Sequence, residues 1–122
     1  GQISELAKAW AQFEFLPEAN HNTLAGILNP EDLFNHSFSI FLQSASDHPR
    51  NQLRGELTRQ AFIKEGINAD LFQAEGETPM AQLWTTLHFG DFAAYYLAMA
   101  YEVDPTPVEA IENFKREMAN AG

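Results

Sequence analysis

Three polar segments of the chain carry side chains that could do acid–base or ligand-binding chemistry. They span residues 18–22, 44–50 and 75–78, and each follows a short apolar run. A histidine exchanges protons near neutral pH, and neighbouring carboxylates, hydroxyls and amides can bind a hydroxylated or anionic small molecule. The residue types suited to such a site are Glu18, Asn20, His21 and Asn22 in the first segment, Ser44, Ser46, Asp47, His48 and Arg50 in the second, and Glu75, Gly76, Glu77 and Thr78 in the third.

Each of these side chains also has a purely structural interpretation. His21 lies between two asparagines and could be solvated or close an Asx-type turn, and His48 before Pro49 is typical of a helix cap. His88 falls inside an apolar segment, which favours a hydrogen-bonded core residue. Arg50 could pair with Glu56 or Asp47, and Lys115 at the edge of an apolar face is typical of a surface lysine.

Composition excludes several classes of function. The chain has 122 residues, no cysteine and a net charge of −10, so thiolate chemistry and Cys-ligated zinc are impossible and nucleic acid or anionic lipid is disfavoured. Its four histidines form no pair at metal-ligand spacing, and no glycine-rich phosphate loop is present, so we expect neither a metal nor a cofactor. The longest apolar run, 92–101, is too short to span a bilayer. We expect a cytoplasmic protein without membrane contact.

Strand-like and helix-like segments alternate along the chain. Strands are predicted at Phe13–Leu16, Ser37–Gln43 and Asn68–Gln73, and helices at 2–12, 30–35, 50–66, 79–102 and from 105 onward. This alternation predicts parallel pairing in an α/β, three-layer open parallel sheet. Ligands bind beyond the carboxyl ends of such strands, which is where the three polar segments would lie. Because three strands make a small sheet, we expect that a strand is missing at the amino-terminal side.

The segment 79–102 is apolar on nearly every side. A helix of this kind is buried on several faces, and one three-stranded layer cannot cover it. We therefore expect the chain to associate, most simply as a homodimer.

Several stretches resemble a known family. The C-terminal stretches are TLHFGDFAAYYLA at 86–98 and VDPTPVEAI at 103–111, with Phe114-Lys115 beyond them. They are similar to the patterns LGD[FW]VSYYLA and VDPTPVxxIxxLK of the bacterial and archaeal bifunctional phosphoglucose/phosphomannose isomerases, members of the sugar isomerase (SIS) superfamily. PEANHN at 17–22, DHPR at 47–50 and EGE at 75–77 resemble the family's PELNHNE, DHPR and SEGES, in the same order.

The resemblance implies a fold and an assembly. Residues 1–122 are similar to a single, partial C-terminal SIS domain with a Rossmann-like sheet, and the family's N-terminal SIS domain would be its partner. The substrate phosphate would be held by a Ser/Thr-rich loop of that first domain. The active site would be completed across a homodimer, with the histidine supplied by the neighbouring subunit.

The resemblance also implies site residues and a reaction. Glu5 matches the family's catalytic glutamate in the segment QISELAK at 2–8, although Ser4 and Leu6 stand where the family has asparagine. His21 matches the ring-opening histidine and Lys115 the C-terminal active-site lysine; Asn20, Asn22 and Thr106 would bind substrate. The expected activity interconverts glucose 6-phosphate or mannose 6-phosphate with fructose 6-phosphate through a cis-enediolate. Two alternatives stay open, namely a SIS-type module that binds a sugar phosphate without converting it, and a structural half that packs on a partner domain.

Overall fold

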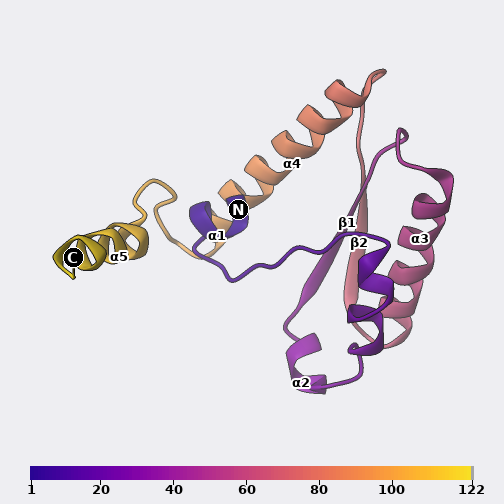
Figure 1. Ribbon diagram of the computed structural model, residues 1–122, viewed down its shortest axis with the longest axis horizontal. Coiled ribbons are helices and arrows are strands. Elements are labelled where there is room, and N and C mark those ends of the chain that lie inside the picture. The colour runs from indigo at the N-terminus through magenta and orange to yellow at the C-terminus, as the bar shows by residue number, and fades with distance from the viewer. Residues whose placement is uncertain (122) are drawn as a thin grey trace. The chain divides into compact units, whose positions relative to one another are not determined.

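The computed structural model describes residues 1–121, which form two compact units. The central unit comprises residues 13–87, and the terminal unit combines residues 1–12 with residues 88–121. The elements in chain order are α1 (Gln2–Leu6), η1 (Glu18–Asn20), η2 (Thr23–Ala25), α2 (Glu31–Phe34), β1 (Phe38–Gln43), α3 (Pro49–Lys64), β2 (Asn68–Gln73), α4 (Pro79–Ala100) and α5 (Glu109–Asn120) (Figure 1). Helix α4 contributes residues to both units.

The sheet of the central unit consists of β1 and β2. The two strands pair in parallel and in register, from Phe38 opposite Asn68 to Gln43 opposite Gln73. Helix α3 connects them, so β1, α3 and β2 form one βαβ unit. The predicted α/β class with parallel pairing is therefore confirmed.

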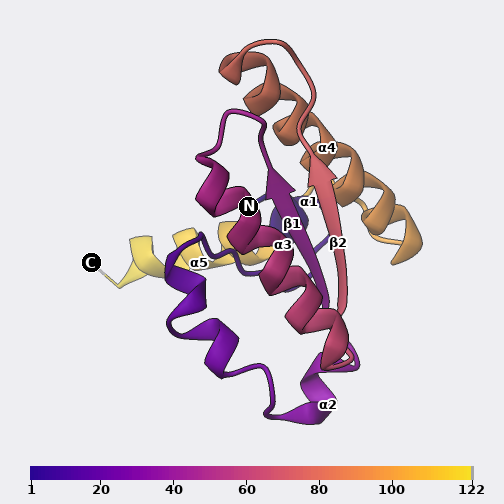
Figure 2. The same ribbon diagram turned by 90° about the vertical axis from the view of Figure 1, so that its right-hand side faces the viewer.

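Helix α3 lies against one face of this sheet (Figure 2). Phe41 of β1 and Phe62 of α3 meet edge to face, with ring centroids 5.6 Å apart. The helix begins at Pro49 after His48, whose Nδ1 accepts a hydrogen bond from the Arg50 N–H at 3.1 Å. It ends before Gly66, whose φ of +84° is the left-handed conformation that commonly terminates helices. The cap predicted at His48 is confirmed.

The opposite face of β1 is apolar and exposed. Phe38, Ile40 and Leu42 alternate with the residues that face α3, and all three are largely accessible in the described chain. Few large side chains are buried among residues 1–121, where the buried apolar residues are Ala7, Ile27, Ile67, Ala74, Ala94 and Ala98. An α/β layer normally covers both sheet faces, so this surface is one that a further element would cover.

The strand predicted at Phe13–Leu16 is not formed. The segment runs beside α3, where a Cβ added to Gly55 would come within 3.6 Å of Leu16 Cδ1. Phe13 and Phe15 contact each other, with ring centroids 6.1 Å apart, and both stay exposed. A strand requires a neighbour to pair its backbone groups, and within residues 1–121 this segment has none.

Two helices are shorter than predicted. Helix α1 ends at Leu6 rather than near residue 12, and Lys8 just beyond it has a φ of +54° that a helix cannot continue. Helix α5 begins at Glu109 rather than at 105, because the Asp104 carboxylate accepts a hydrogen bond from the Thr106 N–H at 2.8 Å and forms a separate turn. The prolines of that segment have no N–H to donate.

Helix α4 is long, as predicted, but its large side chains are not buried. Ala94 and Ala98 are inaccessible, whereas Trp84, Phe92 and Tyr96 are at least half exposed. Thr78 caps the helix through a hydrogen bond from the Ala81 N–H to its hydroxyl, and Pro79 occupies the first position. No described helix combines the length and apolar character needed to cross a lipid bilayer.

Candidate functional site

His21 lies directly after the single turn η1 in the central unit. The turn is closed by backbone hydrogen bonds from the Asn20 N–H to Pro17 O at 3.0 Å and from the His21 N–H to Glu18 O at 2.8 Å. The Asn22 side chain then caps η2, accepting from the Thr23 N–H at 2.7 Å. His21 is exposed at the junction of two capped turns. The side-chain amide oxygen of Asn22 already accepts the hydrogen bond from the Thr23 N–H of the next turn.

The amide of Asn20 contacts helix α3 through both of its ends. Asn20 Nδ2 donates to Thr58 Oγ1 at 2.7 Å, and Asn20 Oδ1 accepts from the Arg54 guanidinium at 3.3 Å. Thr58 Oγ1 also donates to Arg54 O at 2.7 Å within the helix. Thr58 is 4% exposed, so this polar contact is largely shielded from water.

The segments that follow β1 and β2 are joined by Gln82 near the start of α4. Gln82 is buried, its Oε1 accepts from the hydroxyls of Ser44 and Ser46, and its Nε2 donates to Gly76 O at 2.8 Å. The Ser44 N–H is bound by Asp47 Oδ2 at 2.8 Å. Two of the three predicted polar segments therefore meet at the carboxyl ends of the strands. Gln82 bridges them there, with its amide bound to both serine hydroxyls and to the Gly76 carbonyl.

The segment after β2 is also bound to α4 by Thr85. Its hydroxyl donates to Glu75 O at 2.8 Å and accepts from the Glu75 N–H at 3.1 Å. Gly76 follows with a φ of +125°, and a Cβ added there would lie 2.6 Å from Ala81 Cβ. Only glycine fits this position without displacement of the backbone of α4.

Glu5, Thr106 and Lys115 belong to the terminal unit. Glu5 is exposed on α1, and its backbone oxygen accepts from Lys8 Nζ at 2.5 Å. Lys8 Nζ also donates to Pro105 O at 3.1 Å, one residue before Thr106. Lys8 thus links the end of the helix that carries Glu5 to the turn that carries Thr106. Gln2 on the same helix donates to Asp91 of α4 at 2.9 Å.

Lys115 lies near the middle of α5, with its side chain exposed. The apolar side chains Ile111, Phe114 and Met118 of this helix are also exposed. Helix α5 is strongly amphipathic by sequence, and its apolar side chains offer a surface for packing.

Two of the structural interpretations are wrong. His88 is exposed and contacts Phe92 in a tilted arrangement, with ring centroids 4.8 Å apart, instead of being a hydrogen-bonded core residue. Arg50 forms no ion pair with Glu56 or with Asp47. The one salt bridge among residues 1–121 joins Glu56 to Arg59 of the same helix.

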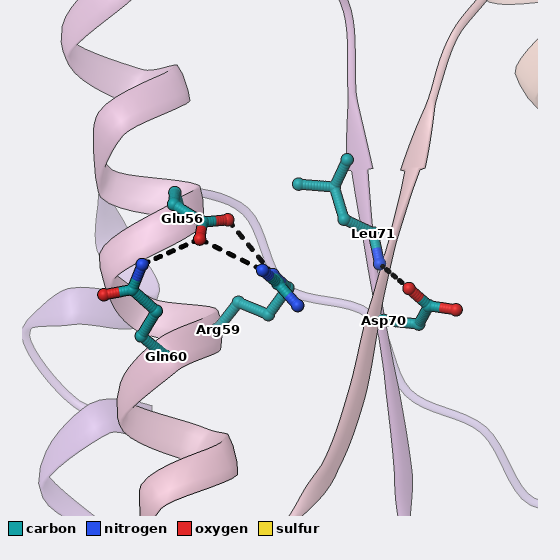
Figure 3. Close-up of polar contacts among 5 residues, drawn as sticks. All are labelled: Glu56, Arg59, Gln60, Asp70 and Leu71. Atoms are coloured by element: carbon teal, nitrogen blue, oxygen red, sulfur yellow. Dashed lines mark hydrogen bonds and ion pairs between the residues drawn. The ribbon is translucent and has the colours of Figure 1, made fainter.

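Glu56, Arg59 and Gln60 form a charged cluster on α3 (Figure 3). Arg59 donates through Nε and its terminal nitrogen at 3.1 and 3.0 Å, and Gln60 donates at 2.8 Å. The hydrogen bonds from Arg59, and then that from Gln60, lower the pKa of Glu56. The same pair raises the pKa of Arg59. Both side chains are partly exposed, so screening by solvent keeps the contribution of the pair to stability small.

Within the described part of the chain, no three His, Cys, Asp or Glu side chains are arranged to hold a metal ion. The residues expected from the sequence to act in proton transfer carry a carboxylate on Glu5, an imidazole on His21 and an ammonium group on Lys115. By type, a carboxylate and an imidazole suit proton transfer between carbon and oxygen, and an ammonium group suits stabilisation of an oxyanion.

Three side chains that organise these segments were not singled out by the sequence reasoning. Thr58 lies three residues after Gly55, and both are buried on α3. A pair of small residues at this spacing on a charged helix indicates that another segment approaches closely. Gln82, a polar residue in an apolar helix, is a similar signal. No sequence pattern predicts that Lys8 donates hydrogen bonds to both Glu5 O and Pro105 O.

Comparison with known proteins identifies the family that the chain resembles in sequence. Residues 1–118 match the family described as "Bacterial phospho-glucose isomerase C-terminal SIS domain". A bifunctional phosphoglucose/phosphomannose isomerase of Aquifex aeolicus is 35% identical over 118 residues, 97% of this chain and 37% of the relative. The protein of the same name from Caldicellulosiruptor bescii is 32% identical over 121 residues, 98% of this chain and 35% of the relative.

The chain spans a little over a third of the length of these curated relatives. No solved structure shows significant similarity to it. The match with the family covers nearly every residue, including the βαβ unit and the segments that carry Glu5, His21 and Lys115. This chain therefore belongs to the C-terminal SIS domain family of the bacterial phosphoglucose isomerases.

Proposed function

We propose that the protein carrying this chain interconverts glucose 6-phosphate or mannose 6-phosphate with fructose 6-phosphate. The observation that supports this most is the similarity of nearly the whole chain to bifunctional phosphoglucose/phosphomannose isomerases. Because the chain covers only 35–37% of those relatives, the activity belongs to a longer protein. In it, residues 1–122 act as one partial C-terminal SIS domain, and an N-terminal SIS domain holds the substrate phosphate.

The reaction assigns a separate proton transfer to each of two residues. His21 moves the proton that opens the sugar ring, as the bond between C1 and the ring oxygen breaks. The Glu5 carboxylate then takes the C2 proton, and the electron pair forms the C1–C2 double bond of the enediolate while negative charge moves to O1. The proton of the C2 hydroxyl passes to O1, the carbonyl forms at C2, and Glu5 returns its proton to C1. The Lys115 ammonium stabilises the oxygen on which negative charge develops.

The exposed apolar surfaces support a partner for this chain. Phe38, Ile40 and Leu42 on β1, and Phe92 and Tyr96 on α4, are accessible in the described residues. Exposed apolar side chains grouped on one element, as on β1 and separately on α4, are typical of interfaces. The N-terminal SIS domain and a second subunit are the occupants that the proposal assigns, so the structural role and the catalytic role belong to one protein.

Replacement of Glu5 tests the catalytic assignment. In the full-length protein, Glu5→Gln keeps the side-chain shape but cannot accept a proton. We expect exchange of the substrate C2 proton with deuterated solvent to fall by at least about 100-fold, with sugar-phosphate binding nearly unchanged. Glu31→Gln is the matched control, since Glu31 also lies exposed in the first turn of a short helix.

His21→Ala tests the other half of the proposal. It should slow turnover of the cyclic sugar phosphate more than turnover of the open-chain fraction, because only the cyclic form requires ring opening. Full proton exchange in Glu5→Gln, or equal loss on both substrate forms in His21→Ala, would show that these roles are assigned wrongly.

A further inference from the structure

The side chain of Asn20, next to His21, is fixed by two groups of helix α3. Thr58 Oγ1 lies 2.7 Å from Asn20 Nδ2, and an Arg54 guanidinium nitrogen lies 3.3 Å from Asn20 Oδ1. Asn20 is partly buried and Thr58 almost completely so. Neither Thr58 nor Arg54 has a part in the proton transfers described above.

The directions of these hydrogen bonds determine one another. A threonine hydroxyl has a single proton, and Thr58 donates it to Arg54 O at 2.7 Å. The same oxygen can then only accept, which directs the NH₂ end of the Asn20 amide toward it. The amide oxygen is left facing Arg54, which can only donate. Only one orientation of the Asn20 amide satisfies both of these contacts.

The imidazole of His21 has no such fixing contacts of its own. Its backbone N–H donates to Glu18 O, but no described residue hydrogen-bonds with its ring. The location of the ring relative to α3 therefore depends on the turn η1, and η1 is bound to α3 through the Asn20 amide.

We propose that Thr58 is a positioning residue for His21, acting through Asn20, and that Arg54 completes this contact. The inference rests on the proposed function, in which His21 opens the ring. It assigns the Asn20 amide to holding the turn and leaves substrate contact to other groups. A displacement of about 1 Å at a reacting group can lower a rate by about 100-fold, so a loosened turn should reduce catalysis although His21 is still present.

The test compares variants of the full-length enzyme. Thr58→Val removes the hydroxyl and keeps the branched shape; Thr58→Ser keeps the hydroxyl. With cyclic sugar phosphate as substrate, we expect Thr58→Val to lower kcat by about 10- to 100-fold with KM changed less than about threefold, and Thr58→Ser to stay within about threefold of the wild type. Exchange of the C2 proton in open-chain substrate should be retained, because that step uses Glu5.

Two further variants separate positioning from folding. Asn20→Ala breaks the same contact but leaves the hydrogen bond between Thr58 and Arg54 inside α3, so it should reproduce the loss in kcat, and the double variant should be no worse than either single one. Thr86→Val is the matched control. Thr86 makes the same hydroxyl-to-carbonyl bond, to Gln82 O at 2.8 Å, but it makes no hydrogen bond with the described residues of η1.

The outcomes distinguish the two proposals. If His21→Ala lowers activity and both Thr58→Val and Asn20→Ala leave kcat unchanged, the positioning role is wrong and the proposed function stands. Equal losses in Thr58→Val and Thr86→Val, or additive losses in the double variant, also overturn it. If His21→Ala has no effect on ring opening, the proposed role of His21 fails and the positioning role fails with it.

Discussion

Gly76 provides the sharpest test of the contact between the sheet and α4. Its φ of +125° is a conformation that other residues rarely adopt, and enforcing it on alanine costs about 1 to 3 kcal/mol. The added Cβ would also lie 2.6 Å from Ala81 Cβ and 3.2 Å from the Ala81 carbonyl carbon. Relieving such an overlap against helix backbone costs about 1 to 3 kcal/mol more.

The stiffer unfolded chain of the alanine variant offsets about 0.4 to 1 kcal/mol of these two costs. Gly76→Ala should therefore lower the free energy of unfolding by roughly 2 to 5 kcal/mol in total. Urea unfolding followed by far-ultraviolet circular dichroism measures this. With a slope of about 2 kcal/mol per molar urea, the midpoint should fall by about 1 to 2.5 M.

Gly66→Ala is the matched control. Gly66 also has a positive φ, of +84°, but nothing lies within 4 Å of the position its Cβ would take. It should cost only the backbone strain, about 1 to 2 kcal/mol. A second check is the pair Gly76→Ala with Ala81→Gly, in which the closest overlap disappears and part of the loss should be recovered. Equal losses at Gly76 and Gly66, with no recovery in the double variant, would refute the steric argument.

Further predictions concern the terminal unit, the charged cluster and assembly. Lys8→Met removes the hydrogen bonds to Glu5 O and Pro105 O, and it should lower kcat of the full-length enzyme by about 10-fold with binding largely kept; unchanged steady-state kinetics would contradict this. Arg59 lowers the pKa of Glu56 in the folded protein. The pair therefore stabilises the fold above the ordinary pKa of 4.5, and this stabilisation is lost as pH falls through the lower pKa of the folded state. Glu56→Gln should reduce the dependence of the melting temperature on pH in that range. The 122-residue chain alone should show no isomerase activity in a coupled assay, since the proposed phosphate-binding loop lies in the other domain. Light scattering at tens of micromolar should detect a dimer rather than a monomer, because apolar side chains such as Tyr96 are exposed.

Local sequence signals determined the elements whose ends are set by neighbouring residues. His48-Pro49 and Gly66 bound α3, Thr78-Pro79 begins α4, and the β-branched and aromatic run at β1 forms a strand. The alternation of strand and helix also determined the parallel pairing, because a helical crossover returns the chain in the same direction. The motifs at 17–22, 47–50, 75–77, 86–98 and 103–115 were sufficient to predict the family.

The tertiary structure alone decided what depends on contacts between distant residues. Phe13–Leu16 has strand-like residues but no strand beside it, and strand propensity without a paired edge does not form a ladder. The tie from Thr58 to Asn20 spans 38 residues, and that from Lys8 to Pro105 spans 97. Hydrogen bonds between residues so far apart in the chain produce no periodic pattern in the sequence, because each partner belongs to a different helix or turn. Their existence depends on where the folded backbone brings two polar groups within reach of each other.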